Sequence, residues 1–459
     1  MQRTQRLAAH VCSAPDLPPP PLAPIPDGRF FPTFPDMLEE SRKHNGVFSY
    51  EAMGNRRITI LAHPSLYDII FELNYPGVIS EKNKLGHAWF GIPLDIAKHN
   101  DASLAQVREA MAPNRADNLN EVVGRGIEQY FAKFPTSGTC DLWEITIGTF
   151  FPVNEAMFGD TFKDHPDALQ LWLDFDKDFA KITAGYPRKM FPEHLAAQEK
   201  VVAIFKKALE DGKDRLPTCP VLSARTDGLP NKGADFSTET KARLMFSIFW
   251  AAQGNTLPMT YWMLAHILAS PGIHERVLKE VRGVELGTGH GFNARESCPF
   301  TMACLYETLR MYNAVLAHRK VVEPVKVSSP SGAACVVPKG DMITMASYIQ
   351  HRDPTVFPDP ETFNPDRWLK EGDPTTTMNK LTAANLFFPF AKGLGSCSGK
   401  HLAMREIPTL VALFLRSFEA ELVDPMPKPH WEEVLASVTP ESFPFDTAVH
   451  TRVKFARRG

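Results

Sequence analysis

The stretch FFPFAKGLGSCSGKHLAMRE, residues 387–406, sets one cysteine, Cys397, among closely spaced glycines. Glycine lacks a Cβ and costs backbone entropy, so such a cluster indicates tight turns or a close approach to something bulky. The residues from Lys400 onward have helical spacing. A thiolate just before a helix is stabilised by the free backbone N–H groups and the helix dipole. Taken alone, the stretch still favours an ordinary buried cysteine, so the rest of the chain must decide.

Length and charge narrow the function classes. The chain has 459 residues, 44% of them hydrophobic and 22% charged, which are ordinary globular values. That length fits either two or three domains or one large helical enzyme. The formal net charge of −3 gives no electrostatic case for a nucleic-acid partner.

Cysteine usage indicates a reducing compartment. The seven cysteines are scattered and include no CxxC pair, so zinc ribbons and thioredoxin chemistry are disfavoured. An odd, sparse set in a long chain does not resemble a disulfide framework.

The domain organisation is predicted to be simple. We expect residues 1–26 to form a leader that ends in a stiff proline-rich hinge, and residues 27–459 to form a single catalytic domain. Two interpretations of the leader stay open: a solvated extension, or a hinge that followed a trimmed membrane anchor. The longest apolar stretch, 244–269, has Gln253, Asn255 and Pro258 at its centre. We therefore predict a core helix there, loosened by the proline, and not a membrane span.

Local patterns predict a mainly α fold with a small β-rich subdomain. VFSYEAM (47–53) and RRITILA (56–62) read as a hairpin, and residues 120–315 as helical. Residues 320–350 are rich in valine and threonine and predict a small sheet. LRSFEAELVDP (415–425) and HTRVKFARR (450–458) are expected to be strands.

Two further motifs precede the cysteine loop. ACLYETLRMYN (303–313) places Glu307 and Arg310 three residues apart, on one face of a helix. DPTVFPDPETFNPDRWL (353–369) sets Arg367 in a rigid, proline-rich segment. Separately, the first is typical of a surface ion pair and the second of a meandering loop.

In that order, ExxR, the proline-flanked arginine and FxxGxxxCxG resemble the cytochrome P450 superfamily of haem-thiolate enzymes. WAAQGNTLPMTYWMLAHIL (250–268), ITAGYPRKMF (182–191) and residues 351–368 are also similar to the branch of sterol 7α- and 12α-hydroxylases and prostacyclin synthase. The resemblance implies the P450 fold, with haem b between the long central helix and the cysteine loop.

The resemblance also assigns site residues. Cys397 would be the axial thiolate of the haem iron, a ligand that favours O–O cleavage. Other residues are expected to bind the cofactor: Phe390, Gly393 and Gly399 beside the ligand loop, and Arg319 on a haem propionate. Glu307, Arg310 and Arg367 would form a buried ion network behind the haem.

The sequence departs from the family in two places. Gly395 stands where most relatives have an arginine, and no WxxxR follows Trp89, so propionate contacts beyond Arg319 are not assigned. On the central helix, Gly254, Asn255 and Thr256 occupy the positions expected to be catalytic, where an acid and a threonine usually deliver protons. An asparagine hydrogen-bonds but does not cycle a proton as an acid does.

Three functions follow from these departures. The favoured one is a monooxygenase that oxidises a hydrophobic sterol, terpenoid or lipid-like substrate with O2 and with electrons from NADPH through a flavoprotein reductase. The second is a reductase-independent peroxide isomerase or dehydratase of the prostacyclin synthase type. The third is a haem-binding sensor without turnover.

The resemblance also indicates where substrate and membrane would meet the protein. Substrate-facing residues are expected near Trp89–Ile92, Ala251, Val315 and Val438. Met190 and Phe191, flanked by basic residues, fit either a peripheral membrane contact or an ordinary surface loop. The expected location is the cytosolic face of the endoplasmic reticulum membrane, by a trimmed anchor or peripherally, and otherwise the cytoplasm.

Overall fold

The computed structural model of the chain describes residues 17–25, 32–52, 56–72, 75–80, 82–97, 100–183, 186–227, 236–284, 297–314, 316–329, 331–429 and 451–459. The predicted leader over residues 1–16, Val315 and Val438 lie outside this part of the chain.

The fold is mainly helical, as the sequence patterns predict. The helices are α2 (Phe34–Lys43), α3 (Asp68–Phe71), α4 (Lys82–Phe90), α5 (Leu94–Ala97), α6 (Asn100–Ala110), α7 (Pro113–Lys133), α8 (Leu142–Thr146), α9 (Phe150–Phe158), α10 (Ala168–Asp176), α11 (Phe179–Thr183), α12 (Pro192–Glu210), α13 (Pro220–Asp227), α14 (Thr238–Gly254), α15 (Thr256–Ala269), α16 (Pro271–Gly283), α18 (Pro299–Tyr312), α19 (Ser347–Gln350), α20 (Pro374–Ala383) and α21 (Lys400–Ser417).

The strands form three sheets. A five-stranded sheet has the order β1-β2-β8-β5-β3, a three-stranded sheet the order β4-β10-β9, and β6 pairs with β7. Their bounds are β1 (Val47–Ala52), β2 (Arg56–Leu61), β3 (Val78–Ile79), β4 (Ser137–Asp141), β5 (Leu316–Val321), β6 (Val325–Ser328), β7 (Ala334–Val337), β8 (Met342–Ala346), β9 (Phe418–Leu422) and β10 (Arg452–Arg457).

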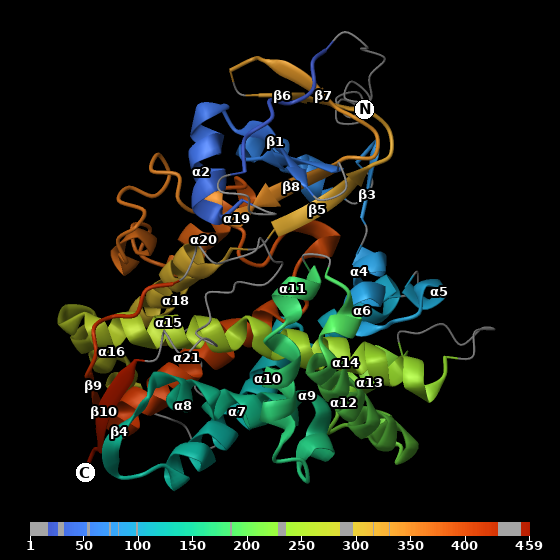
Figure 1. The fold of residues 1–459 in the computed structure, drawn as a ribbon. Helices are drawn as coiled ribbons and strands as arrows, with labels where there is room; N and C mark the ends of the chain where they lie inside the picture. Colours follow the sequence, from blue (N-terminus) through green and yellow to red (C-terminus); the bar gives the residue numbers. More distant parts are fainter. Residues whose placement is uncertain are drawn as a thin grey trace.

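The large helical part and the five-stranded sheet occupy different ends of the molecule (Figure 1). The helices α14 and α15 follow one another across its middle, and most other helices lie on the side away from that sheet. Apolar side chains from α7, α9, α10, α12, α14, α15, α18 and α21 form one hydrophobic core, while smaller clusters lie around the sheet. No helix in the described ranges is long and apolar enough to cross a membrane.

Local chemistry explains several boundaries. The Thr33 hydroxyl accepts from the Asp36 N–H, and the Asp36 carboxylate accepts from the Thr33 N–H, so this pair caps the start of α2. The hairpin is confirmed: β1 and β2 are antiparallel, with Val47 opposite Leu61. The two C-terminal strands are also confirmed, and β9 pairs with β10.

Two expectations need correction. Residues 120–315 are not helical throughout, because β4 lies within them and pairs with β10 from the C-terminus. Strand propensity is weak in SGTCD, and the distant partner strand decides its structure. The segment 320–350 contributes to two sheets and ends in the short helix α19.

The central helix is divided. α14 ends at Gly254 and α15 begins at Thr256, with Asn255 between them at φ −112°. The physical cause is Pro258, which has no N–H to offer the Gly254 carbonyl four residues earlier. The backbone hydrogen bonds of the helix resume at Met259, whose N–H donates to the Asn255 carbonyl over 3.1 Å. The predicted loosening is therefore a break of the helix, three residues before the proline.

Candidate active site

Backbone geometry shapes the cysteine loop. The Cys397 N–H donates to the Phe390 carbonyl over 2.9 Å, and the Ser396 N–H donates to the Gly393 carbonyl over 3.1 Å. Gly393 has φ +65°, and a Cβ there would lie 2.8 Å from the Phe71 carbonyl oxygen. Only glycine fits at that position, because other side chains would clash and be strained.

The Cys397 thiol is accessible at the start of α21. Its sulfur accepts hydrogen bonds from the backbone N–H groups of Gly399 and Lys400, which favour the thiolate. The Cys397 side chain is exposed, yet desolvation by the surrounding protein raises the pKa of its thiol, against those two donors. This thiol is therefore open to a ligand.

Two side chains that the sequence patterns did not single out hold the loop from other helices. Arg108, on α6, donates from Nη2 to the Ser396 carbonyl over 3.2 Å. Asn313, at the end of α18, donates from Nδ2 to the Pro389 carbonyl over 2.9 Å. The sequence gives no signal for either contact, because both are made to backbone carbonyls of a distant loop.

A buried ion network lies on α18 and the segment after it. Both oxygens of Glu307 accept from Arg310, over 2.8 Å and 2.9 Å, and Glu307 also accepts from Arg367 Nε over 3.0 Å. Trp368 Nε1 donates to the same carboxylate over 3.0 Å, as does the Asn364 N–H. Glu307 and Arg310 are fully buried.

The carboxylate at the centre of the network is fully paired, while the network as a whole keeps one positive charge. One carboxylate faces two guanidinium groups, and their remaining N–H groups donate to carbonyls: Arg310 to His351 and Arg367 to Pro358. A buried network of this kind fixes the register of its elements, and removing one member strands a charge. The network thus joins the ExxR motif on α18 to the proline-rich segment that carries Arg367.

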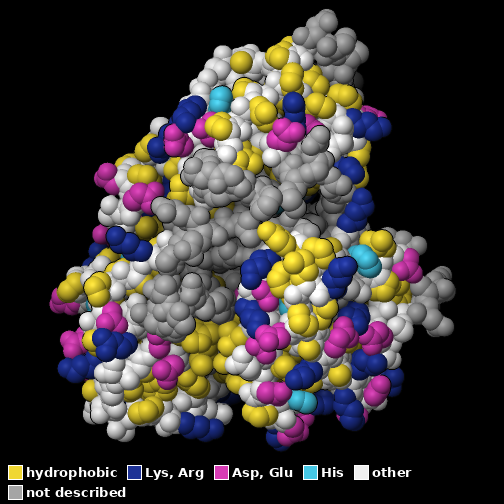
Figure 2. Space-filling view, in the orientation of Figure 1, with side chains coloured by type: hydrophobic (Ala, Val, Ile, Leu, Met, Phe, Trp, Pro, Cys, Tyr) yellow, Lys and Arg dark blue, Asp and Glu magenta, His cyan; other side chains and the backbone are white. Residues whose placement is uncertain are grey.

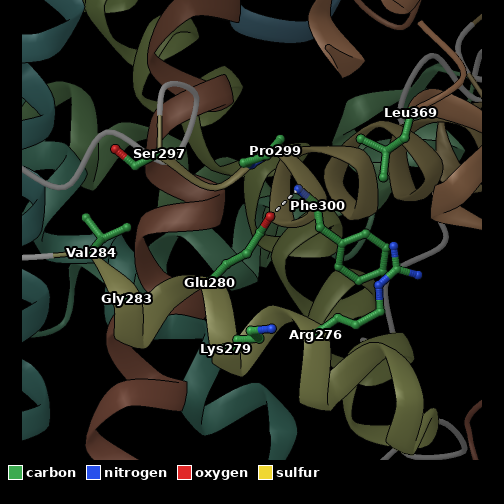
Figure 3. Close-up of a pocket in the computed structure, with 9 residues that line it drawn as sticks. All are labelled: Arg276, Lys279, Glu280, Gly283, Val284, Ser297, Pro299, Phe300 and Leu369. Atoms are coloured by element: carbon green, nitrogen blue, oxygen red, sulfur yellow. Dashed lines mark hydrogen bonds between the residues drawn. The ribbon is translucent and has the colours of Figure 1, made fainter. Parts of the chain in front are cut away.

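A surface cavity of about 560 Å³ adjoins the other end of α18. Figure 3 shows Glu280 pointing at the first turn of α18, where its carboxylate accepts from the N–H groups of Phe300 and Thr301 over 2.7 Å and 2.8 Å. Arg276 lies over the Phe300 ring, 3.5 Å from its centroid, and pairs with Asp366. These groups satisfy one another and orient the helix that carries the network.

The three central-helix residues differ in exposure. Asn255 is exposed at the break between α14 and α15, whereas Gly254 and Thr256 are buried. The Thr256 hydroxyl donates to Glu406 Oε1 on α21 over 2.9 Å. Desolvation raises the pKa of Glu406 to about 8. An acid and an alcohol therefore do meet here, but the acid comes from α21.

Arg319 lies half-buried on β5. Its Nη1 donates to the neighbouring His318 carbonyl over 2.9 Å, and desolvation lowers its pKa. No carboxylate of the described ranges forms a salt bridge with it. A guanidinium held in this way suits an anionic group supplied by a ligand.

Comparison with known proteins identifies the family. The profile of the family described as "Cytochrome P450" matches residues 157–445. The chain belongs to the cytochrome P450 family. It is a haem-thiolate oxidoreductase, a monooxygenase that uses O2 and NADPH-derived electrons delivered through a reductase.

Three relatives illustrate the similarity. The human "24-hydroxycholesterol 7-alpha-hydroxylase" is 23% identical over 88% of this chain and 87% of its own length. "Lanosterol 14-alpha demethylase" of Cunninghamella elegans is 23% identical over 84% of this chain and 81% of its own. A rabbit (Oryctolagus cuniculus) "7-alpha-hydroxycholest-4-en-3-one 12-alpha-hydroxylase" is 31% identical over 39% of this chain and 38% of its own.

The described residues fit the cofactor of this family. The accessible thiol at the start of α21, the glycine that lets the loop approach Phe71 and the arginine on β5 supply a ligand, a cradle and a cation. Bound haem supplies reductive activation of O2, which no amino-acid side chain provides.

Proposed function

We propose that this P450 hydroxylates a sterol. One atom of O2 enters a C–H bond of the substrate, and the other leaves as water with two electrons from NADPH and two protons. The observation that carries the proposal is the accessible Cys397 thiol, held by two backbone donors, in a chain whose relatives named above act on sterols. Their names give three different positions of attack, so the proposal extends to the sterol nucleus and not to one carbon.

The proposed roles of the residues follow their placement. We infer that Cys397 binds the iron, with Phe390, Gly393 and Gly399 shaping its loop, and that Arg319 binds a propionate. Of the three central-helix residues, Asn255 is the exposed one, and we assign to it the hydrogen bonds on the substrate side. Thr256 positions α15 against α21 through Glu406.

The peroxide isomerase receives less support than the monooxygenase. The three relatives named above are hydroxylases or a demethylase. The sensor receives less support as well, because these relatives are named as enzymes.

Membrane contact is part of the proposal. Met190 is 58% exposed on the short turn Arg188–Met190, beside Lys189. An exposed apolar side chain next to a cation suits an anionic membrane surface, which supports the cytosolic face of the endoplasmic reticulum as location. A flavoprotein reductase as partner there is part of the same proposal. Flotation with anionic vesicles tests this: a Met190→Asp variant that floats as well as the wild type would rule the contact out.

Charge elsewhere gives no reason for another partner. Figure 2 shows Lys and Arg interspersed with Asp and Glu over one face of the molecule, without a large area of one sign. Such a face does not have the basic stripe that nucleic-acid binding requires.

The first experiment is a carbon monoxide difference spectrum of the dithionite-reduced protein and of Cys397→Ala. We expect the red-shifted Soret band of thiolate-ligated haem in the wild type and its loss in the variant. Turnover then compares a sterol panel with NADPH and reductase under ¹⁸O₂ against organic peroxides without reductase. Incorporation of ¹⁸O into a sterol supports the proposal. Rearrangement or dehydration of the peroxide itself, with no ¹⁸O entering any sterol, would contradict it.

A further inference from the structure

One carboxyl group of the helical part lies beside the central helix with no cation to pair with it. Asp176 is the last residue of α10, and its Oδ1 accepts a hydrogen bond of 2.7 Å from Trp250 Nε1 on α14. In Figure 1, α10 and α11 lie against α14. The contact joins residues that are 74 positions apart in the chain, so neither motif nor periodicity indicates it.

The surroundings of Asp176 are shielded from bulk water. Its side chain keeps some accessible surface, yet desolvation by the protein raises the pKa of its carboxyl to about 7, against the favourable bond from Trp250. Among the described residues, no lysine, arginine or histidine forms a salt bridge with it, whereas Asp178, two residues on, pairs with Lys181 at 2.8 Å. Asp176 thus lacks the cation that its neighbour Asp178 has.

Aromatic rings cluster around Trp250, the donor to this carboxyl. Phe179 lies 4.1 Å from Trp250 between ring centroids, and Phe90 lies 5.5 Å from Trp250. Trp89 contacts Phe179 at 5.4 Å. Two of the segments expected to face substrate, the one that begins at Trp89 and the one around Ala251, therefore converge on this place.

The distance along α14 from Trp250, the partner of Asp176, to Asn255 sets the size of the ligand that could contact both places. Ala251, next to Trp250, is exposed, as is Asn255. Trp250 precedes Asn255 by five residues, which is about 7.5 Å along a helix axis. A rigid molecule of several fused rings spans that length.

One oxygen of the carboxyl is left over. Oδ1 receives the indole N–H, and no donor of the described ranges reaches Oδ2. An acceptor in an apolar wall is costly unless a donor satisfies it. A substrate that brings one hydroxyl group supplies that donor.

We propose that Asp176 is a specificity-determining residue that accepts a hydrogen bond from a hydroxyl group of the substrate on the carboxyl oxygen that Trp250 does not occupy. The substrate class is thus a hydroxysterol whose polar end lies against α10 and whose apolar nucleus extends toward Asn255. This inference rests on the proposed function and deepens it. The competing interpretation is a purely structural tie between α10 and α14.

The test uses the haem-loaded protein and two ligands, cholesterol and its 3-deoxy analogue. Dissociation constants come from the Soret shift that each ligand produces. We expect the wild type to prefer cholesterol by about tenfold or more, the value of one hydrogen bond to a carboxyl. Asp176→Leu should reduce the preference to near one, and Asp174→Asn, an exposed control on the same helix, should leave it unchanged.

A second variant separates recognition from structure. Trp250→Phe removes the indole donor and leaves the carboxyl, so the preference for cholesterol should persist. A structural tie would instead affect Asp176→Leu and Trp250→Phe alike, which overturns the inference. The carbon monoxide spectrum reports whether each variant holds haem. If Asp176→Leu does not fold, Asp176→Ala, whose side chain has no hydrogen-bond acceptor either, replaces it with the same expected loss.

The two proposals fail differently. If sterols bind and are hydroxylated but Asp176→Leu keeps the wild-type preference, the inference is wrong and the function stands. If neither sterol shifts the Soret band of a wild type with a normal carbon monoxide band, the proposed sterol substrate is wrong. The proposed hydrogen bond from its hydroxyl group to Asp176 is then wrong as well.

Discussion

Two buried carboxyl groups on neighbouring helices differ in how their loss of hydration is compensated. Glu307 on α18 and Glu406 on α21 are 0% and 2% exposed. Glu307 accepts from Arg310 and Arg367, and also from an indole and a backbone N–H. Glu406 accepts one hydrogen bond, from Thr256, and its Oε2 has no partner among the described residues.

The difference is whether cations come with the carboxyl. Two guanidinium groups compensate the charge of Glu307, so the group serves as an anchor. No cation of the described residues pairs with Glu406, so desolvation raises its pKa to about 8 and the group keeps its proton at neutral pH. Equal burial therefore gives a fixed charge behind the cysteine loop and a neutral acid beside the central helix.

We call Glu307 with its two arginines the paired side, and Glu406 with Thr256 the unpaired side. The largest expected effect comes from breaking the paired side. Glu307→Gln leaves two buried guanidinium groups without their common anion, which costs about 3–5 kcal/mol of unfolding free energy. Urea denaturation followed by circular dichroism measures the loss, and the carbon monoxide band measures haem retention. We expect a protein that folds poorly and holds little haem.

The control for this variant is an exposed pair of the same chemistry. Glu371 pairs with Lys380 at 2.7 Å, and both side chains are largely exposed. Glu371→Gln should change stability by less than about 0.5 kcal/mol. Equal losses for the two variants would mean that burial of the network adds nothing.

Much of the paired side could be predicted from the sequence. Glu307 and Arg310 are one helical turn apart, and Arg367 stands in a rigid proline-rich segment, so their residue types and spacing carry the information. The loop around Cys397 is similar, because glycines mark where the backbone must turn. The strands β1, β2, β9 and β10 were also predictable from local patterns.

The unpaired side was not predictable. Thr256 and Glu406 are 150 positions apart, and Asp176 meets Trp250 only through the packing of α10 on α14. A single polar residue in an apolar helix does not indicate which distant residue it contacts. The break at Asn255 was only partly predictable. Pro258 indicates that one backbone hydrogen bond of the helix is missing, but not at which residue the helix ends.

A smaller effect is expected from the neutral donor of the paired side. Trp368→Phe removes the indole N–H that lies 3.0 Å from Glu307 Oε2 and keeps both arginines. A hydrogen bond to a charged group contributes about 1.5–3 kcal/mol, so stability should fall by that amount while haem is retained. The same denaturation series checks it. Haem loss equal to that of Glu307→Gln would show that the indole, and not charge pairing, sets the geometry.

The smallest effect at pH 6 is expected on the unpaired side. Glu406→Gln replaces a neutral acid by a neutral amide that still accepts from Thr256, so stability should change by only about 1 kcal/mol. The contrast sharpens as the pH rises. The carboxyl of Glu406 has a pKa of about 8 when folded and an ordinary value of 4.5. Between these values the folded chain holds a proton that the unfolded chain has released.

Raising the pH through that window therefore destabilises the wild type relative to Glu406→Gln, by at most about 1.4 kcal/mol per pH unit. Because the folded pKa is the higher one, this stability is fully present below pH 4.5 and is lost by about pH 8. Unfolding free energies of both proteins at pH 5.5, 6.5 and 7.5 measure the slope of their difference. A constant difference would mean that Glu406 is already ionised in the folded protein, so that an undetected cation or water compensates it, and the contrast with Glu307 would disappear.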